Sequence, residues 1–329
     1  MSAPSGSVCL VCLDPVASAR TSTGGGEGEG EGEGDAYHPR CLRALFGVPR
    51  LPRVDFELRN LHSVSLELAG KVALSGVQRK VAVALDAEGR ALVPAPVGSR
   101  YILKPQANAF PHVPENEHLT MRLAARCGLE IPACSLLRLA DGSLAYVVRR
   151  FDRADDGRKL QVEDFNQLAE QPTKDRYEGS AELCARLLKR HASEPVIEAV
   201  KLFRQMAFSW AVGNGDLHLK NLSLVTGADG RVRMSPAYDL LDSEIILGAD
   251  DLALSVGGKK RNLTARSWRE YGAYCGLPEK VVRKELQRLS EHLRASLPVV
   301  ERSLLPEELR ALYADGLSSR AAVIAAASP

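Results

Sequence analysis

The chain has 329 residues, which is long enough to bury a large core in two lobes. With 45% hydrophobic and 26% charged residues, it has the composition of a soluble globular protein. The net charge of +2 gives no sign of direct DNA binding, and no apolar run reaches the roughly 18 residues that a membrane span needs. The first residues lack the pattern of a secretory signal, so a cytoplasmic protein is expected.

Residues 1–47 are predicted to form a small cysteine-bearing module. Its candidate metal ligands come as a C-x2-C pair and an H-x2-C pair, namely Cys9, Cys12, His38 and Cys41. Three thiolates and an imidazole suit a closed tetrahedral Zn²⁺ site, which would be structural because no ligand position is left for water. Unligated thiols are the alternative. Between the two pairs, residues 24–34 are three glycines followed by alternating Glu and Gly, so a mobile loop is expected there.

A β-rich lobe is predicted over residues 54–150. Short runs rich in β-branched and aromatic residues predict its strands, which are expected at 81–85, 101–104, 135–139 and 144–148. One helix is expected within this lobe, over residues 115–127, because Leu119, Leu123 and Ala124 then share one face.

Lys104 ends the apolar strand that begins at Tyr101. From there its ammonium group could point back across the sheet to the phosphates of a nucleotide, as a point charge. The alternative is a lysine that protects an edge strand from aggregation. Glu117, on the helix that follows, could pair with Lys104 and hold it in place, with Glu115 as the competing partner.

Residues 151–329 are predicted to form a helical lobe, with helices expected at 194–212, 281–293 and 306–313. The first of these is apolar at helical spacing and leads directly into the run Asn-Gly-Asp-Leu-His-Leu-Lys-Asn at 214–221. A β-rich lobe that contains one helix, followed by a helical lobe, is the order of a two-lobed protein-kinase-like fold. The predicted fold class is therefore α+β, with a small N-terminal Cys/His module.

Three residues have the chemistry that phosphoryl transfer from ATP requires, namely Asp216, Asn221 and Asp239. Asp216 follows a glycine in its loop and is the candidate base that accepts the proton of the attacking hydroxyl. Asn221, five positions later, and Asp239, at the end of a strand-like segment, are candidate oxygen ligands of Mg²⁺. The alternative roles are structural, with Asp216 as a turn former and Asn221 as a turn-stabilising amide.

Residues around this trio are predicted to have supporting roles. We expect His218 to shape the loop by hydrogen bonding rather than to titrate, and Lys220 either to reach the γ-phosphate or to be solvated. Asp242 is expected to cap a helix or turn. The basic, glycine-rich run at 257–261 is expected to be a solvated turn, with contact to a substrate or nucleic acid as the alternative.

Seven motifs, in the same order along the chain, resemble those of the HipA-type toxin kinases, and the likeness runs from about residue 72 to the C-terminus. They are Ser75-Gly-Val-Gln-Arg-Lys80, Tyr101-Ile-Leu-Lys-Pro105, Glu115-Asn-Glu-His118, Arg149-Arg-Phe-Asp-Arg153, Glu163-Asp-Phe-Asn166, Gly213-Asn-Gly-Asp-Leu-His-Leu-Lys-Asn221 and Pro236-Ala-Tyr-Asp239. Any one of them alone would be weak evidence, whereas the ordered set is specific.

The resemblance implies a serine/threonine protein kinase that uses Mg²⁺ and ATP. In that family the matching Ser-Gly loop covers the nucleotide phosphates, the matching hinge holds adenine through backbone groups, and Asp152 would lie near the ribose. Together, the residues and the resemblance predict the nucleotide-binding set Ser75, Gly76, Val77, Gln78, Lys80, Lys104, Glu117, Arg149, Phe151, Asp152, His218, Lys220 and Tyr238.

The resemblance also implies a biological role. Known substrates in the family are aminoacyl-tRNA synthetases, whose phosphorylation halts translation, and a helix-turn-helix antitoxin usually restrains the kinase. Larger members carry a further N-terminal subdomain, and this chain looks like the compact variants. Ala73 stands where the family often has a first serine, so Ser75 is the candidate for autophosphorylation. The alternatives to a toxin kinase are a small-molecule kinase of the aminoglycoside or choline type and a non-catalytic ATP-binding docking module.

Overall fold

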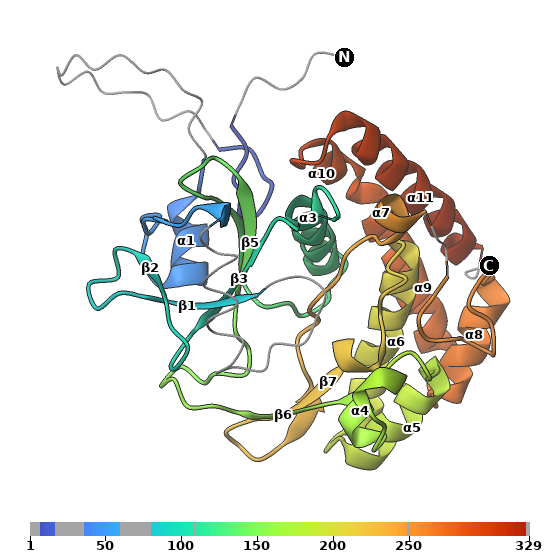
Figure 1. Cartoon of the computed structure of the whole chain (residues 1–329). Coiled ribbons are helices and arrows are strands. Elements are labelled where there is room, and N and C mark those ends of the chain that lie inside the picture. The colour runs from blue at the N-terminus through green and yellow to red at the C-terminus, as the bar shows by residue number, and fades with distance from the viewer. Residues whose placement is uncertain (1–6, 17–35, 60–79, 108, 249–250, 327–329) are drawn as a thin grey trace, which may run out of the picture. The chain divides into compact units, whose positions relative to one another are not determined.

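The computed structural model describes residues 7–16, 36–59, 80–107, 109–248 and 251–326 (Figure 1). The chain divides into two compact units, of which the first contains 1–106 and 133–149 and the second contains 107–132 and 150–329. The first unit is built on a five-stranded sheet and the second is mainly helical, which confirms the predicted α+β class. The Cys/His segment belongs to the same unit as the sheet, whereas the helix expected inside the β-rich lobe belongs to the other unit.

An antiparallel sheet with the strand order β2-β1-β3-β5-β4 forms the centre of the first unit. Its strands are β1 (Val81–Leu85), β2 (Leu92–Pro94), β3 (Tyr101–Pro105), β4 (Cys134–Arg138) and β5 (Leu144–Arg149). The four predicted strands are confirmed, with ends that agree within one residue. Strand β2 was not predicted because three residues are too few to show an alternating pattern.

Helix α1 (Pro39–Phe46) covers one face of this sheet. It begins with proline and ends at Gly47, which has a φ of 80°. Its apolar residues follow helical spacing and pack with alternate strand residues in one core, made up of Leu42, Leu45, Phe46, Val81, Val83, Leu92, Tyr101, Leu103, Leu137, Leu139, Ala145 and Val147. Because side chains alternate along a strand, Lys104 belongs to the opposite face of β3.

The second unit is a group of helices. They are α3 (Val113–Arg126), α4 (Phe165–Leu168), α5 (Ala181–His191), α6 (Pro195–Ala211), α7 (Glu244–Leu247), α8 (Ala265–Tyr274), α9 (Glu279–Ala295), α10 (Leu297–Glu301) and α11 (Glu307–Ala325). Helices α6, α8, α9 and α11 pack against one another, and the rings of Phe203, Trp210, Trp268 and Tyr271 join α6 to α8. Among the described residues, no helix has the length and apolar character to cross a bilayer.

Two of the predicted C-terminal helices agree closely with α6 and α9, whereas α11 is longer than expected. The prediction ended at Tyr313 because Gly316, Ser318 and Ser319 weaken the helical pattern. A small antiparallel sheet, β6 (Gln161–Asp164), β7 (Ser223–Thr226) and β8 (Val232–Met234), was not expected in this unit. This sheet matters for the candidate site because β7 begins directly after the loop at 214–221, which follows the end of α6.

Candidate active site

The predicted catalytic loop begins where α6 ends. Gly213 has a φ of 72°, and a Cβ at this position would lie 2.5 Å from Oδ1 of Asp242. Asn214 is fully buried, its N–H donates to the Ser209 carbonyl over 2.9 Å, and its Oδ1 accepts from the Asp216 N–H over 3.2 Å. The chain therefore leaves the helix in a conformation that requires glycine, and Asn214 fixes the start of the loop.

The side chain of Asn221 closes this loop onto Asp216. Its Nδ2 donates to the Asp216 carbonyl over 3.0 Å, and its backbone N–H donates to the His218 carbonyl over 2.9 Å. The amide oxygen of Asn221 is then the end that can bind a cation. The five-residue spacing has a geometric origin, because the 3₁₀ turn Leu219–Asn221 brings the chain back beside Asp216.

Tyr177, which no sequence motif singled out, holds the Asp216 carboxylate. Its hydroxyl donates to Oδ1 of Asp216 over 2.7 Å. The Arg176 guanidinium lies over the Tyr177 ring, 4.9 Å from its centroid, and the Arg176 carbonyl accepts from the Leu219 N–H over 3.1 Å. Burial and the bond to Asp216 raise the pKa of Tyr177, so its hydroxyl remains a donor. Tyr177 precedes Asp216 by 39 residues, so no local pattern could have indicated the contact.

His218 is subject to the charges of both candidate carboxylates. Its ring packs edge-on against Tyr177, with centroids 5.0 Å apart. Burial and the nearby Arg176 lower the pKa of His218, while the charges of Asp216 and Asp239 oppose this shift. His218 is therefore neutral at physiological pH, which fits a role in shaping the loop.

Tyr238 anchors the segment that carries Asp239. Its hydroxyl donates to the Lys220 carbonyl over 2.9 Å and shares a hydrogen bond of 2.6 Å with the Ser223 hydroxyl. Its ring lies against Phe151, with centroids 5.2 Å apart, so two predicted nucleotide-binding residues are in contact. Asp239 itself has a φ of 54°, a left-handed conformation that Asp and Asn adopt more readily than other residues.

Lys220 forms an ion pair with Asp164, the last residue of β6. The distance from Nζ to Oδ2 is 3.0 Å, and the Lys220 side chain is 20% exposed. Asp164 also caps α4 by accepting from the Gln167 N–H over 2.8 Å, and it lies opposite Ser223 in the β6–β7 register. Lys220 is therefore not a freely solvated lysine, and its contact with a γ-phosphate stays a prediction.

Two arginines hold Asp152, the residue predicted to lie near a ribose. Arg150 contacts both carboxylate oxygens, over 2.9 and 2.6 Å, and Arg153 donates to Oδ2 over 2.7 Å. Burial opposes ionisation of Asp152, but the guanidinium groups outweigh burial and lower its pKa. The carboxylate is therefore ionised, and a ribose hydroxyl would share its oxygens with the arginines.

Lys104 lies on the central strand β3, so the edge-strand alternative is wrong. The residue is 4% exposed, and its Nζ lies 5.5 Å from the ring centroid of Tyr146, its register partner in β5. Such burial is rare for a lysine and indicates a specific role. Glu117 is buried on α3, in the second unit, and Glu115 contacts His112 at 3.2 Å.

The other predicted nucleotide-binding residues lie at the ends of strands or outside the described part of the chain. Arg149 is the last residue of β5, and its N–H donates to the Ala133 carbonyl over 2.8 Å. Lys80 directly precedes β1 and is half-buried. The phosphate-loop residues lie outside the described residues and stay predictions, as does autophosphorylation; they are Ser75, Gly76, Val77 and Gln78.

Two buried hydrogen bonds between Asn116 and Asp242, which the sequence did not predict, fix the segment after Asp239. Nδ2 of Asn116 donates to the Asp242 carbonyl and the Asp242 N–H donates to Oδ1 of Asn116, both over 2.8 Å. Oδ1 of Asp242 accepts from the N–H groups of Glu244 and Ile245 at the start of α7, as expected for a cap. Burial raises the pKa of Asp242 to about 7. The network thus joins α3 to the end of the catalytic segment.

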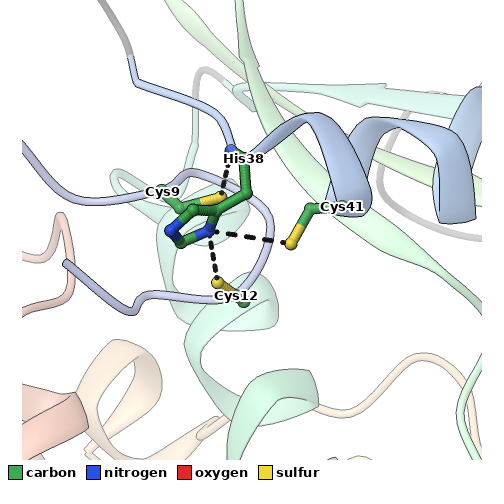
Figure 2. Close-up of side chains that lie close together, drawn as sticks. All are labelled: Cys9, Cys12, His38 and Cys41. Atoms are coloured by element: carbon green, nitrogen blue, oxygen red, sulfur yellow. Dashed lines mark hydrogen bonds between the residues drawn. The ribbon is translucent and has the colours of Figure 1, made fainter. Parts of the chain in front are cut away.

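The structure also brings together the four predicted metal ligands. The ligand atoms of Cys9, Cys12, His38 and Cys41 all lie within 4.8 Å of one another (Figure 2). Nδ1 of His38 lies 3.4 Å from Sγ of Cys12 and 3.8 Å from Sγ of Cys41. A hydrogen bond with Cys12 lowers the pKa of Cys9 to about 4, whereas the same hydrogen bond raises the pKa of Cys12 and burial raises the pKa of Cys41, so Cys9 is the thiol that ionises most readily.

The sequence matches the HipA-like C-terminal domain over residues 72–297. The chain belongs to this family. It is 31% identical to a Sinorhizobium fredii protein named "Putative kinase Y4mE" and 29% identical to another from the same organism, "Putative kinase Y4dM". The alignments cover 67% and 77% of this chain but 54% and 65% of the relatives, so this HipA-like chain spans about half to two thirds of their length.

Solved structures show the same fold. HipA in the Shewanella oneidensis MR-1 complex of HipA, HipB and operator DNA is similar with a TM-score of 0.66 at 21% identity, over 78% of this chain and 66% of that chain. The proinflammatory kinase CtkA of Helicobacter pylori is similar with a TM-score of 0.51 at 14% identity, over 69% of this chain and 88% of that chain. The predicted kinase-like, HipA-like fold is thereby confirmed.

Proposed function

We propose that this HipA-like chain is an ATP-dependent serine/threonine protein kinase. The observation that carries the proposal is the geometry of the loop at 214–221. Nδ2 of Asn221 donates to the Asp216 carbonyl over 3.0 Å, and the Tyr177 hydroxyl donates to Oδ1 of Asp216 over 2.7 Å. Membership of the family and the kinase names of the two relatives support the class of reaction.

The donor set of this loop fits Mg²⁺. The amide oxygen of Asn221 and the carboxylate of Asp239 are hard oxygen ligands, which Mg²⁺ prefers. The amide nitrogen of Asn221 is held by the Asp216 carbonyl, so its oxygen has a defined direction. When bound, Mg²⁺ would neutralise charge on the triphosphate. Lys104 is the proposed phosphate-binding cation, because its ammonium is buried on the face of β3 opposite the α1 core.

Asp216 is the proposed base. Transfer forms a bond between a substrate hydroxyl oxygen and the γ-phosphorus, breaks the bond from that phosphorus to the bridging oxygen, and releases ADP. The hydroxyl proton passes to Asp216. Because Tyr177 donates to Oδ1 over 2.7 Å, Oδ2 is the oxygen left to accept that proton, and the carboxylate is held in one orientation.

The proposed biological role is that of a cytoplasmic toxin that arrests growth. A protein of the translation machinery, such as an aminoacyl-tRNA synthetase, is the proposed substrate on the basis of the family resemblance. The similar Shewanella protein is found with HipB and operator DNA, which supports an antitoxin as the partner of this chain.

The test is incubation of the purified chain with γ-³²P-ATP, Mg²⁺ and an extract of its host. We expect label on one or a few host proteins, and Asp216→Asn should abolish that label, because the amide cannot accept the proton. Glu301→Gln is the matched control, since Glu301 is an exposed carboxylate at the end of α10. Expression of the same three proteins in the host should arrest growth with the wild type and the control only.

Label that survives Asp216→Asn would refute the proposed base. Transfer to small alcohols in place of proteins would indicate the small-molecule kinase. A chain that binds ATP but transfers no phosphoryl group to either class would indicate the docking module.

A further inference from the structure

The Cys/His cluster of the first unit has the dimensions of a tetrahedral zinc site. Zn–N and Zn–S bonds of about 2.0 and 2.3 Å place the ligand atoms about 3.5 to 3.8 Å apart at tetrahedral angles. The distances from Nδ1 of His38 to Sγ of Cys12 and Cys41 are 3.4 and 3.8 Å. Figure 2 shows both sulfur atoms turned toward this one ring nitrogen. The side chains are therefore arranged around a common centre.

The hydrogen bonds of His38 leave the correct ring nitrogen for a metal. Nε2 lies 3.2 Å from the Pro15 carbonyl, and a carbonyl can only accept, so Nε2 carries the proton. Nδ1 of the neutral ring then has its lone pair directed to the sulfur atoms. A second ring nitrogen that donates to a backbone carbonyl is usual for metal-binding histidines. The His38 N–H also donates to Sγ of Cys9 over 3.3 Å, a contact that stabilises a thiolate.

The segments that carry these ligands cover the outer edge of β4. Because β4 is the last strand of the sheet, its outward peptide groups need partners. The Leu10 carbonyl, which lies between the first two cysteines, accepts from the Leu136 N–H over 3.1 Å and from the Ser135 hydroxyl over 2.9 Å. The Tyr37 hydroxyl, next to His38, donates to the Leu136 carbonyl over 3.1 Å.

The fourth ligand connects this edge to the core of the sheet. Cys41 lies on α1, whose residues Leu42, Leu45 and Phe46 pack into the core. One ion would thus join the turn between Cys9 and Cys12 to His38, which follows Tyr37, and to Cys41 on α1. No disulfide links these ligands, because all three cysteines are free thiols.

We propose that Cys9, Cys12, His38 and Cys41 bind one structural Zn²⁺ and that this ion fastens the N-terminal segments to the edge of β4. Thiolate and imidazole ligands favour Zn²⁺ over Mg²⁺ and Ca²⁺, and four protein ligands leave no open position for catalysis.

The first test measures the metal content of the purified full-length chain. We expect one zinc per chain, and a visible spectrum of tetrahedral thiolate-bound cobalt after exchange with Co²⁺. Cys12→Ser should lose the zinc, whereas His38→Cys should keep it because four thiolates also form a zinc site. Cys275→Ser, which alters a half-buried thiol outside the cluster, is the matched control and should keep the zinc. A zinc-free chain without a cobalt spectrum would overturn the proposal, as would equal zinc loss in Cys275→Ser.

The second test needs no substitution and addresses the fastening role. Amide hydrogen exchange is measured on the wild-type chain before and after zinc is removed with a chelator. The Leu136 amide should exchange at least about tenfold faster without zinc, because its acceptor is the Leu10 carbonyl, while amides of α9 should not change. Unchanged exchange at Leu136 in a chain that has lost its zinc would overturn the fastening role. Equal acceleration in α9 would do the same, since it would mean general unfolding.

Discussion

Substitution of Gly213 by alanine should destabilise the second unit by more than the strain of its backbone conformation. The φ of 72° costs a non-glycine residue about 1–2 kcal/mol. In addition, the new methyl group would lie 2.5 Å from Oδ1 and 3.0 Å from Cγ of Asp242. Asp242 would have to move away from the N–H groups of Glu244 and Ile245, and loss of such a cap costs about 0.5–2 kcal/mol. The expected loss of unfolding free energy is therefore about 1.5–4 kcal/mol.

The matched control is Gly276→Ala. Gly276 has a φ of 77° in the same unit, and nothing lies within 4 Å of a Cβ built there. This variant should lose only the free energy that the backbone strain costs, about 1–2 kcal/mol of unfolding free energy. Urea denaturation followed by tryptophan fluorescence suits the comparison, because both tryptophans of the chain, Trp210 and Trp268, belong to the second unit.

A third variant isolates the clash. In an Asp242→Ala background the carboxylate that the methyl group would meet is gone, so Gly213→Ala should then destabilise no more than Gly276→Ala does. Equal losses in Gly213→Ala and Gly276→Ala in the wild-type background, to within about 0.5 kcal/mol, would refute the reasoning. The reasoning would also be refuted if Gly213→Ala lowered the unfolding free energy by the same amount in the wild-type and Asp242→Ala backgrounds.

Two further predictions concern the groups around Asp216. Tyr177→Phe removes a hydrogen bond to the Asp216 carboxylate, but Tyr177 is 37% exposed, so water can replace part of that bond. We therefore expect the activation free energy to rise by about 1 kcal/mol, which is roughly a fivefold lower kcat, with an unchanged KM for ATP. An unchanged kcat would show that Tyr177 does not position the base. Relative to the parent, Asp242→Asn should stabilise the chain increasingly as pH rises from about 4 to 7, and by a constant amount above that. Because burial raises the pKa of Asp242 from 3.8 to about 7, its contribution is fully present below pH 3.8 and is lost as pH rises through about 7, whereas an amide loses nothing. Urea denaturation across this pH range checks the trend, and a difference between variant and parent that shrinks with pH would contradict it.

The strands and the longer helices were predictable because their signals are local. The apolar run of β3 and the helical spacing in α6 each lie within one segment, and the structure has both elements within one residue of the predicted ends. Short or mixed segments gave no such signal. Strand β2 has three residues, and the second half of α11 contains Gly316, so neither pattern was strong enough to predict.

The sequence by itself determined the family and predicted the reaction class, because the motifs around Asp216 and Asp239 each lie within a few residues and each residue type has a distinct chemistry. It likewise determined the pairs of candidate zinc ligands. Only the tertiary structure decided that Tyr177 holds Asp216 and that Asn116 holds Asp242, contacts that span 39 and 126 residues. The structure also decided that Lys104 lies on a central strand. Such contacts depend on the path of the whole chain, since a hydrogen bond between distant residues leaves no periodic trace in the segments that provide them.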